Sequence, residues 1–193
     1  MESVAGLSAN SMAGSGVDWS CGPWEATCST RLVRQRGTHD CGVACLAMST
    51  ASSYESARAT FIALGLDQGT TPYSSNFAQL RGAVGQHASE GRAYQAKMVR
   101  WRGWDAFSGV GILKVRNCAA RNWHWVVAES HPELGILARD PDYPMVLLER
   151  PCLDVVHSSL GWLEPYGNWL SVTITESLRV GAGQRPAAIR TTN

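Results

Sequence analysis

The hydrophobic pattern of this chain changes period about halfway along, and this change limits the possible fold more than any other feature. In the first half, apolar residues recur at helical spacing behind residues that favour helix N-termini. In the second half, short apolar runs are typical of strands, with breaks at His131-Pro132 and Asp140-Pro141. Helices followed by a mainly antiparallel sheet make an α+β fold, so we expect a site in the crevice between the two halves.

The limits of these elements follow from the same pattern. Asp40, Ser53 and Asn76 each stand before a helical stretch and are residue types that cap helices, and Gly65 is expected to end the second helix. The expected helices are residues 40–50, residues 54–66 and a third that begins after Asn76. The expected strands are residues 93–100, 109–116, 123–130, 135–140, 145–150 and 168–175.

Length and composition predict one folded domain. The chain has 193 residues, of which 45% are hydrophobic and 17% charged, so it can bury a single core and is not typical of a disordered chain. Residues 1–18 are rich in Gly and Ser, and residues 179–193 in Gly, Pro, Arg and Thr, so we expect flexible segments around a domain at 19–178. The net charge of +1, without a long run of one sign, argues against a nucleic-acid partner.

The sequence gives no sign of a membrane segment or of a structural metal. No stretch approaches the roughly 20 apolar residues of a membrane helix, and the N-terminus lacks the basic and apolar regions of a Sec signal. We therefore expect a protein made in the cytoplasm, with secretion by another route left open. The six cysteines do not have zinc-site spacing, and without a signal peptide they do not predict a disulfide framework.

The most informative segment is residues 34–48, with the sequence RQRGTHDCGVACLAM. Cys41 lies at the start of an expected helix, where free N–H groups and the helix dipole favour a thiolate. Gly42 leaves room for the backbone of a substrate to approach. Gln35 lies six residues earlier, and its amide N–H together with the Cys41 backbone N–H would stabilise the oxygen of a tetrahedral intermediate.

A thiolate nucleophile also needs a proton carrier, and His124 is the candidate. It lies between Trp123 and Trp125 on an expected strand, where aromatic neighbours exclude water. Asp140, at the end of the next strand, is suited to hold the imidazole by its other nitrogen. The other histidines are His39, His87, His131 and His157.

Each of these residues also has a simpler interpretation. A cysteine is often just a small core residue, and we assign Cys45, Cys118 and Cys152 to that role. A histidine between tryptophans is often packed in a core, and an aspartate before proline is often an ordinary turn residue. What favours catalysis is the joint order: a glutamine, a cysteine on a helix, a histidine on a strand, and an aspartate on the next strand.

This order of motifs resembles the bacteriocin-processing, double-glycine-leader cysteine peptidases. The match to this family spans residues 30–175. It consists of a glutamine followed by five residues and CGxxCLxM, then HWVV and finally DP. The resemblance implies a papain-like fold in which Gln35 stabilises the oxyanion, Cys41 is the nucleophile, His124 the general base and Asp140 its orienting residue. It also implies cleavage after Gly-Gly, with narrow pockets for the two glycines. We expect Trp123 or Trp125 to narrow the entrance, and the mechanism requires neither a metal nor an organic cofactor.

The resemblance leaves the biological use open. Members of the family often precede an ATP-driven exporter with a membrane domain and a P-loop, and neither feature occurs in this sequence. One expectation is an antibacterial effector toxin that cleaves proteins with a Gly-Gly motif in a target cell and is neutralised by an immunity protein. The alternatives are a freestanding leader peptidase that matures a bacteriocin-like precursor, an amidase or transglutaminase on the same fold, and a binding module that has lost activity.

Overall fold

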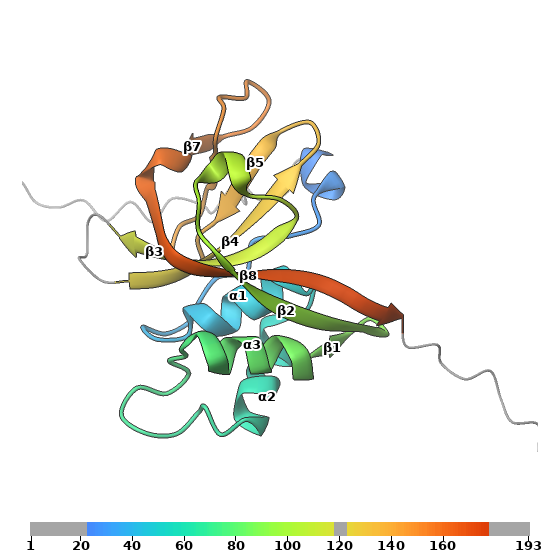
Figure 1. Cartoon of the computed structure of the whole chain (residues 1–193), viewed down its shortest axis with the longest axis vertical. Coiled ribbons are helices and arrows are strands. Elements are labelled where there is room, and N and C mark those ends of the chain that lie inside the picture. The colour runs from blue at the N-terminus through green and yellow to red at the C-terminus, as the bar shows by residue number, and fades with distance from the viewer. Residues whose placement is uncertain (1–22, 118–122, 178–193) are drawn as a thin grey trace, which may run out of the picture.

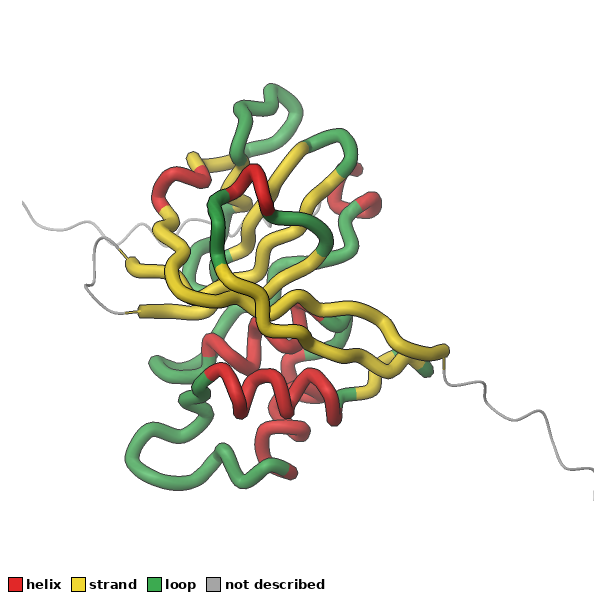
Figure 2. Tube along the Cα trace, in the orientation of Figure 1, coloured by secondary structure: helices red, strands yellow, loops and turns green. Residues whose placement is uncertain are grey.

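The structure, a computed structural model, describes residues 23–117 and 123–177. The predicted flexible segments at residues 1–18 and 179–193, and Cys118, lie outside the described residues. Three α-helices lie against one side of an eight-stranded sheet, and the sheet curves away above them (Figure 1). Tracing the chain by secondary structure shows the three α-helices grouped at one end, with most strands and short helical turns at the other (Figure 2). The expected α+β architecture is therefore confirmed.

The three helices begin where the sequence predicts. The side chain of Ser53 accepts a hydrogen bond from the Ser56 N–H, and Asn76 forms a reciprocal capping box with Gln79. The second helix ends earlier than predicted because Gly65 takes the left-handed conformation, with φ of 70°. The helices are α1 (Cys41–Ser49), α2 (Tyr54–Ala63) and α3 (Phe77–Gln86), and short 3₁₀ turns are η1 (Pro23–Thr27), η2 (Trp104–Ala106) and η3 (Leu160–Trp162).

Asp40 precedes α1 as predicted, but its side chain does not cap that helix. Its backbone has φ of −101° and ψ of 18°, which is not the extended conformation of a typical N-cap residue. The carboxylate instead accepts hydrogen bonds from the backbone N–H groups of Arg36 and Gly37 and from the hydroxyl of Tyr54. The prediction that Asp40 caps α1 is therefore wrong, because its side chain bonds to the loop before the helix.

The sheet has the strand order β1-β2-β8-β3-β4-β5-β6-β7. Neighbouring strands are antiparallel except β6 and β7, which are parallel. All six predicted strands are present, whereas β1 and β7 were not expected. The strands are β1 (Ala88–Ser89), β2 (Arg92–Arg100), β3 (Val110–Asn117), β4 (Trp123–His131), β5 (Gly135–Arg139), β6 (Val146–Leu148), β7 (His157–Ser159) and β8 (Leu163–Ser177).

Strand β8 starts five residues before its predicted beginning, despite containing Pro165. Along β8, strand β2 pairs only with residues 168–177, so near Pro165 the only partner strand is β3. Proline has no N–H to donate, but at a position with one open edge this costs no ladder bond. The long strand therefore tolerates a residue that normally argues against a central strand.

Both faces of strand β4 are buried. Along β4, Trp125 and Val127 pack toward the helices, while Val126 and Ala128 pack into a second cluster on the opposite face. This alternation follows from the two-residue period of a strand, and two covered faces explain why β4 reads as a nearly continuous apolar run. In residues 23–117 and 123–177 no helix has the length and apolarity needed to cross a membrane.

Helix α1 lies in the centre of the apolar cluster between the sheet and the helices, and every residue from Gly42 to Ser49 is buried. A Cβ atom added to Gly42 would collide with the Ser75 hydroxyl oxygen and would lie 3.4 Å from the ring of Phe61. The missing side chain thus lets the loop at Ser75 and helix α2 pack closely against the first turn of α1. Close packing therefore explains why residue 42 is a glycine, which the sequence alone did not reveal.

We therefore expect Gly42→Ala to destabilise the fold by about 1–3 kcal/mol, because the methyl group overpacks this contact. Gly82→Ala is the matched control: Gly82 is also helical, but nothing lies within 4 Å of its added Cβ. There the change should stabilise by about 0.5–1 kcal/mol, since alanine is the better helix former. Urea unfolding measures both changes, and Ser75→Ala should restore part of the loss in the Gly42→Ala background. A Gly42→Ala variant as stable as Gly82→Ala would contradict this account.

Candidate active site

Three elements bring the candidate catalytic residues together. Cys41 is the first residue of α1 and is partly exposed, whereas Cys45, one turn later, is fully buried. Helix α1 packs against β4, which carries His124 near its start. Asp140 directly follows the last residue of β5, and β5 is the antiparallel neighbour of β4. Their arrangement therefore depends on the packing of α1 and on the β4–β5 pairing.

His124 and Asp140 form a direct hydrogen bond. His124 Nε2 lies 2.6 Å from Asp140 Oδ1, and only 13% of each side chain is exposed. Asp140 Oδ1 also accepts a hydrogen bond of 2.8 Å from the Asp142 N–H, which fixes the carboxylate within its own turn. Since Nε2 is engaged by Asp140, the other ring nitrogen of His124 is the one available to Cys41.

The protonated, positively charged form of His124 is strongly favoured. Burial alone lowers the pKa of this imidazole, but hydrogen bonds and charge interactions with Asp140 and Cys41 outweigh burial and raise the pKa to about 10. At neutral pH the ring therefore carries a proton and lies beside Cys41. Since the folded pKa lies above the ordinary value near 6.5, the resulting stabilisation is complete below about pH 6.5 and is lost as the pH rises toward 10.

The other histidines are engaged elsewhere or lie in the open. His87 bonds to Thr60, His131 to Thr27, and His157 accepts a hydrogen bond from the Cys152 N–H. His39 is exposed. Among the histidines, the one that has both a carboxylate and Cys41 as partners is His124.

Gln35 is tied to the turn that carries Asp140. Its backbone N–H donates to the Pro141 carbonyl over 3.1 Å, and the Arg34 side chain donates to the Asp142 carbonyl over 2.9 Å. The Gln35 side-chain oxygen is buried without a hydrogen-bond partner in the described part of the chain. The protein thus fixes the Gln35 backbone close to Asp140 and leaves one polar atom of its amide unengaged.

The two tryptophans beside His124 have different environments. Trp125 is 1% exposed, donates its Nε1–H to the Ser75 carbonyl, and packs edge-on against Phe77, so it belongs to the core and does not line an entrance. Trp123 is 44% exposed and stacks edge-on against Trp125, with the Lys114 amine 4.5 Å from its ring centre. Of the two expected entrance residues, only Trp123 is at the surface.

A larger and a smaller cavity lie in the described part of the chain, and Asp140 lines the smaller one. It has a volume of about 220 Å³ and is lined by Asp140, with Val115, Asp142, Tyr143, Leu147, Trp162 and Leu163. Val115 pairs with His124 across the β3–β4 ladder, which places this cavity beside the His124–Asp140 pair.

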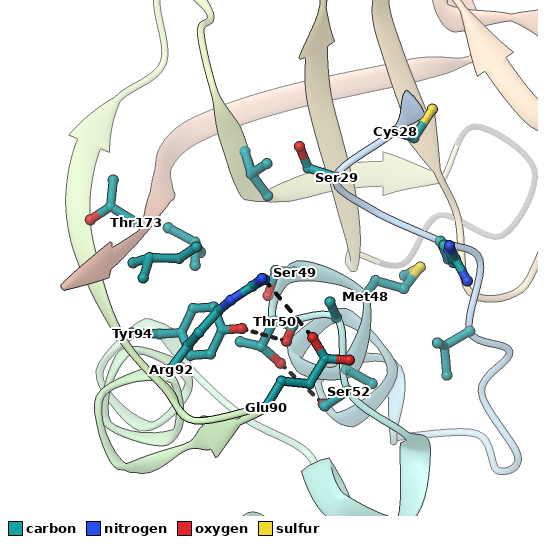
Figure 3. Close-up of a pocket in the computed structure, with 17 residues that line it drawn as sticks. Cys28, Ser29, Met48, Ser49, Thr50, Ser52, Glu90, Arg92, Tyr94 and Thr173 are labelled. Carbon is teal, nitrogen blue, oxygen red and sulfur yellow. Dashed lines mark hydrogen bonds and ion pairs between the residues drawn. The ribbon is translucent and has the colours of Figure 1, made fainter. Parts of the chain in front are cut away.

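The larger cavity, of about 750 Å³, lies at the opposite end of α1, between residues 48–52 and strands β2 and β8 (Figure 3). There Tyr94 donates its hydroxyl to the Thr50 carbonyl. A nine-residue helix spans about 13 Å at 1.5 Å per residue, so this cavity is well separated from Cys41. None of Cys41, His124 and Asp140 lines it. Its size therefore does not identify it as the place of the chemistry.

The sequence interpretation missed the groups that hold the candidate residues in place. Asp142 fixes Asp140 through its backbone, the Pro141 carbonyl holds Gln35, and Asp40 holds the loop between Gln35 and Cys41. The Asp-Pro-Asp pattern at residues 140–142 was a usable signal, because aspartate side chains often bond to the backbone two residues later. No comparable pattern indicated the partners of Asp40.

Comparison with known proteins adds no relative. No protein-family model matches the chain, and no curated protein matches it significantly. The resemblance to double-glycine-leader peptidases therefore rests on the motif residues alone.

We expect Cys41 to react first with iodoacetamide. At about pH 6 an ordinary thiol of pKa near 8.5 is only about 0.3% thiolate, whereas pairing with the protonated His124 keeps Cys41 reactive. Burial raises the pKa of Cys45 and raises that of Cys28 to about 11, so both should label slowly. Peptide mapping by mass spectrometry measures the individual rates.

His124→Ala should slow the labelling of Cys41, while the control His157→Ala should not, because His157 bonds to Cys152. Equal labelling of Cys41 and buried Cys45 in the folded protein would count decisively against the assignment.

Proposed function

We propose that this protein is a papain-like cysteine endopeptidase. The observation that carries the proposal is the 2.6 Å hydrogen bond between His124 and Asp140, on a strand that packs against α1, the buried helix that begins at Cys41. A nucleophile, a base and a group that orients the base form the arrangement that thiol acyl transfer requires. The α+β architecture, in which helices pack on a mainly antiparallel sheet, is compatible with the fold that the motif implies.

The proposed reaction is acyl transfer. The Cys41 thiolate attacks the carbonyl carbon of the scissile bond, and the oxygen becomes negatively charged in a tetrahedral intermediate. The Cys41 N–H and the Gln35 amide donate hydrogen bonds to that oxygen. His124 then gives its proton to the leaving amine, and the thioester forms. Water, deprotonated by His124, then attacks the thioester, the acyl group leaves as a carboxylic acid, and the Cys41 thiolate and protonated His124 are restored.

We propose bonds after Gly-Gly as the substrate, in a protein or peptide chain. The support is the motif resemblance together with the exposed Trp123 next to His124. A bulky ring at the entrance would exclude a Cβ at the two residues before the cut. Such a clash also displaces the carbonyl from Cys41, so discrimination should exceed the roughly 10–200-fold that a methylene earns in an ordinary apolar pocket.

Variants of the four residues test the mechanism. Cys41→Ala and His124→Ala should abolish hydrolysis of a Gly-Gly peptide, because each removes a group that reacts. Gln35→Ala should lower kcat by about 10²–10³-fold, as for loss of one oxyanion donor. Asp140→Ala should fall between these effects, because it orients His124 and does not itself react. Activity retained in His124→Ala would exclude the proposed base.

Substrate variants test the Gly-Gly specificity, and cell growth tests the biological role of the protein. Changing both glycines of the substrate to alanine should abolish cleavage, and efficient cleavage of the alanine peptide would overturn the Gly-Gly proposal.

Growth arrest of a bacterium that expresses the wild-type protein but not Cys41→Ala would assign an effector, which an immunity protein should neutralise by covering Cys41 and His124. Harmless expression with cleavage of a leader peptide would assign a processing enzyme, and amine-linked products a transglutaminase.

A further inference from the structure

Asp40 lies directly before Cys41 and is only 3% exposed. A carboxylate next to a nucleophilic thiolate is electrostatically unfavourable, so its presence needs a compensating reason. It does not cap α1, although its backbone carbonyl accepts the first helical hydrogen bond, from Ala44. The reason must come from the groups that its side chain contacts.

These groups belong to the loop before α1 and to the start of α2. The Arg36 N–H donates to Oδ2 over 2.9 Å and the Gly37 N–H to Oδ1 over 3.0 Å. The Tyr54 hydroxyl donates to Oδ2 from the first residue of α2. Burial, together with this bond to Asp40, raises the pKa of Tyr54, so the phenol remains a donor.

The bonds to Asp40 place Gln35 between two anchors. Its own N–H is held by the Pro141 carbonyl, and the next N–H along the chain, that of Arg36, is held by Asp40. The backbone on both sides of the Gln35 side chain is therefore fixed, one anchor in the Asp140 turn and the other beside Cys41. A side chain that donates to an oxyanion needs such positioning, because displacement by about 1 Å can cost 10²-fold in rate.

We propose that Asp40 and Tyr54 are positioning residues that set the Gln35 amide for the oxyanion. The inference rests on the proposed peptidase function and goes beyond it. Outside this pair, the Arg36 guanidinium lies 4.3 Å above the Tyr54 ring and pairs with Glu55. Both side chains of that ion pair are more than half exposed, so it adds little to the arrangement.

The test uses two reactions at the same sulfur atom. Peptide hydrolysis passes through an oxyanion, whereas alkylation by iodoacetamide does not. Tyr54→Phe removes one donor to Asp40 while keeping the buried ring, so it should fold, and Asp40→Asn is the second variant. Each should lower kcat by about 10- to 10²-fold with KM nearly unchanged. Tyr54→Phe should leave Cys41 alkylation at the wild-type rate, whereas Asp40→Asn should not slow it, because this change removes a negative charge beside the sulfur.

Tyr94→Phe is the matched control. Tyr94 is also 6% exposed, and its hydroxyl donates to a carbonyl at the other end of α1, so the change removes a buried hydrogen bond without touching the loop. Its kcat should remain that of the wild type. In a Gln35→Ala background, Tyr54→Phe should cause no further loss of kcat, because the group that it positions is absent.

Two results would overturn the proposal: Tyr54→Phe slowing alkylation as much as hydrolysis, or its effect multiplying with that of Gln35→Ala. Either would assign the pair to general support of α1. A wild-type protein that alkylates at Cys41 but hydrolyses no peptide, whether or not it contains Gly-Gly, would instead reject the peptidase function itself.

Discussion

Burial of helix α1 on all sides is the constraint on which the candidate site depends. Its residues from Gly42 to Ser49 contact two helices on one side and the sheet on the other, and their apolar side chains are almost completely removed from water. Full burial of a leucine- or methionine-sized side chain stabilises by about 1.5–3 kcal/mol, so sliding or turning the helix would lose several such contributions at once. Cys41, at its first residue, is therefore held in a fixed position relative to β4.

The turn after β5 supplies the second fixed point. Asp140 and Pro141 accept hydrogen bonds from His124 and Gln35, which are 89 residues apart in the sequence. The residue before the turn, Arg139, is buried and pairs with Glu25 at 3.0 Å. A buried charge that loses its partner is strongly unfavourable, so this pair fastens the N-terminal η1 segment to the end of β5. The position of Asp140 thus depends on contacts on both sides of it.

Local signals in the sequence predicted the helices and strands. Tertiary contacts decided the hydrogen-bond partners and the exposure of individual side chains, which the sequence did not predict. Ser53 and Asn76 have their bonding partners within three residues, so their caps could be predicted. Asp40 had two possible sets of N–H partners, and the choice depended on Tyr54, which belongs to another helix. Period-two alternation placed Trp123 and Trp125 on one side of β4, but their different exposure depends on Ser75 and Phe77, which pack over Trp125 alone. The Cys41, His124 and Asp140 grouping was predicted from order along the chain, whereas the bonds that tie the Gln35 loop to the Asp140 turn join segments more than 100 residues apart.

The two aspartates near Cys41 carry out opposite tasks because their donors differ. Asp140 accepts the imidazole N–H, so its charge favours the proton on His124. Asp40 is engaged by two backbone N–H groups and a phenol, so its carboxylate is committed to the loop before α1. The same hydrogen bonds that make Asp40 tolerable beside the nucleophile also shape the loop at Gln35, so the electrostatic cost of Asp40 and the order of the oxyanion loop have one structural cause.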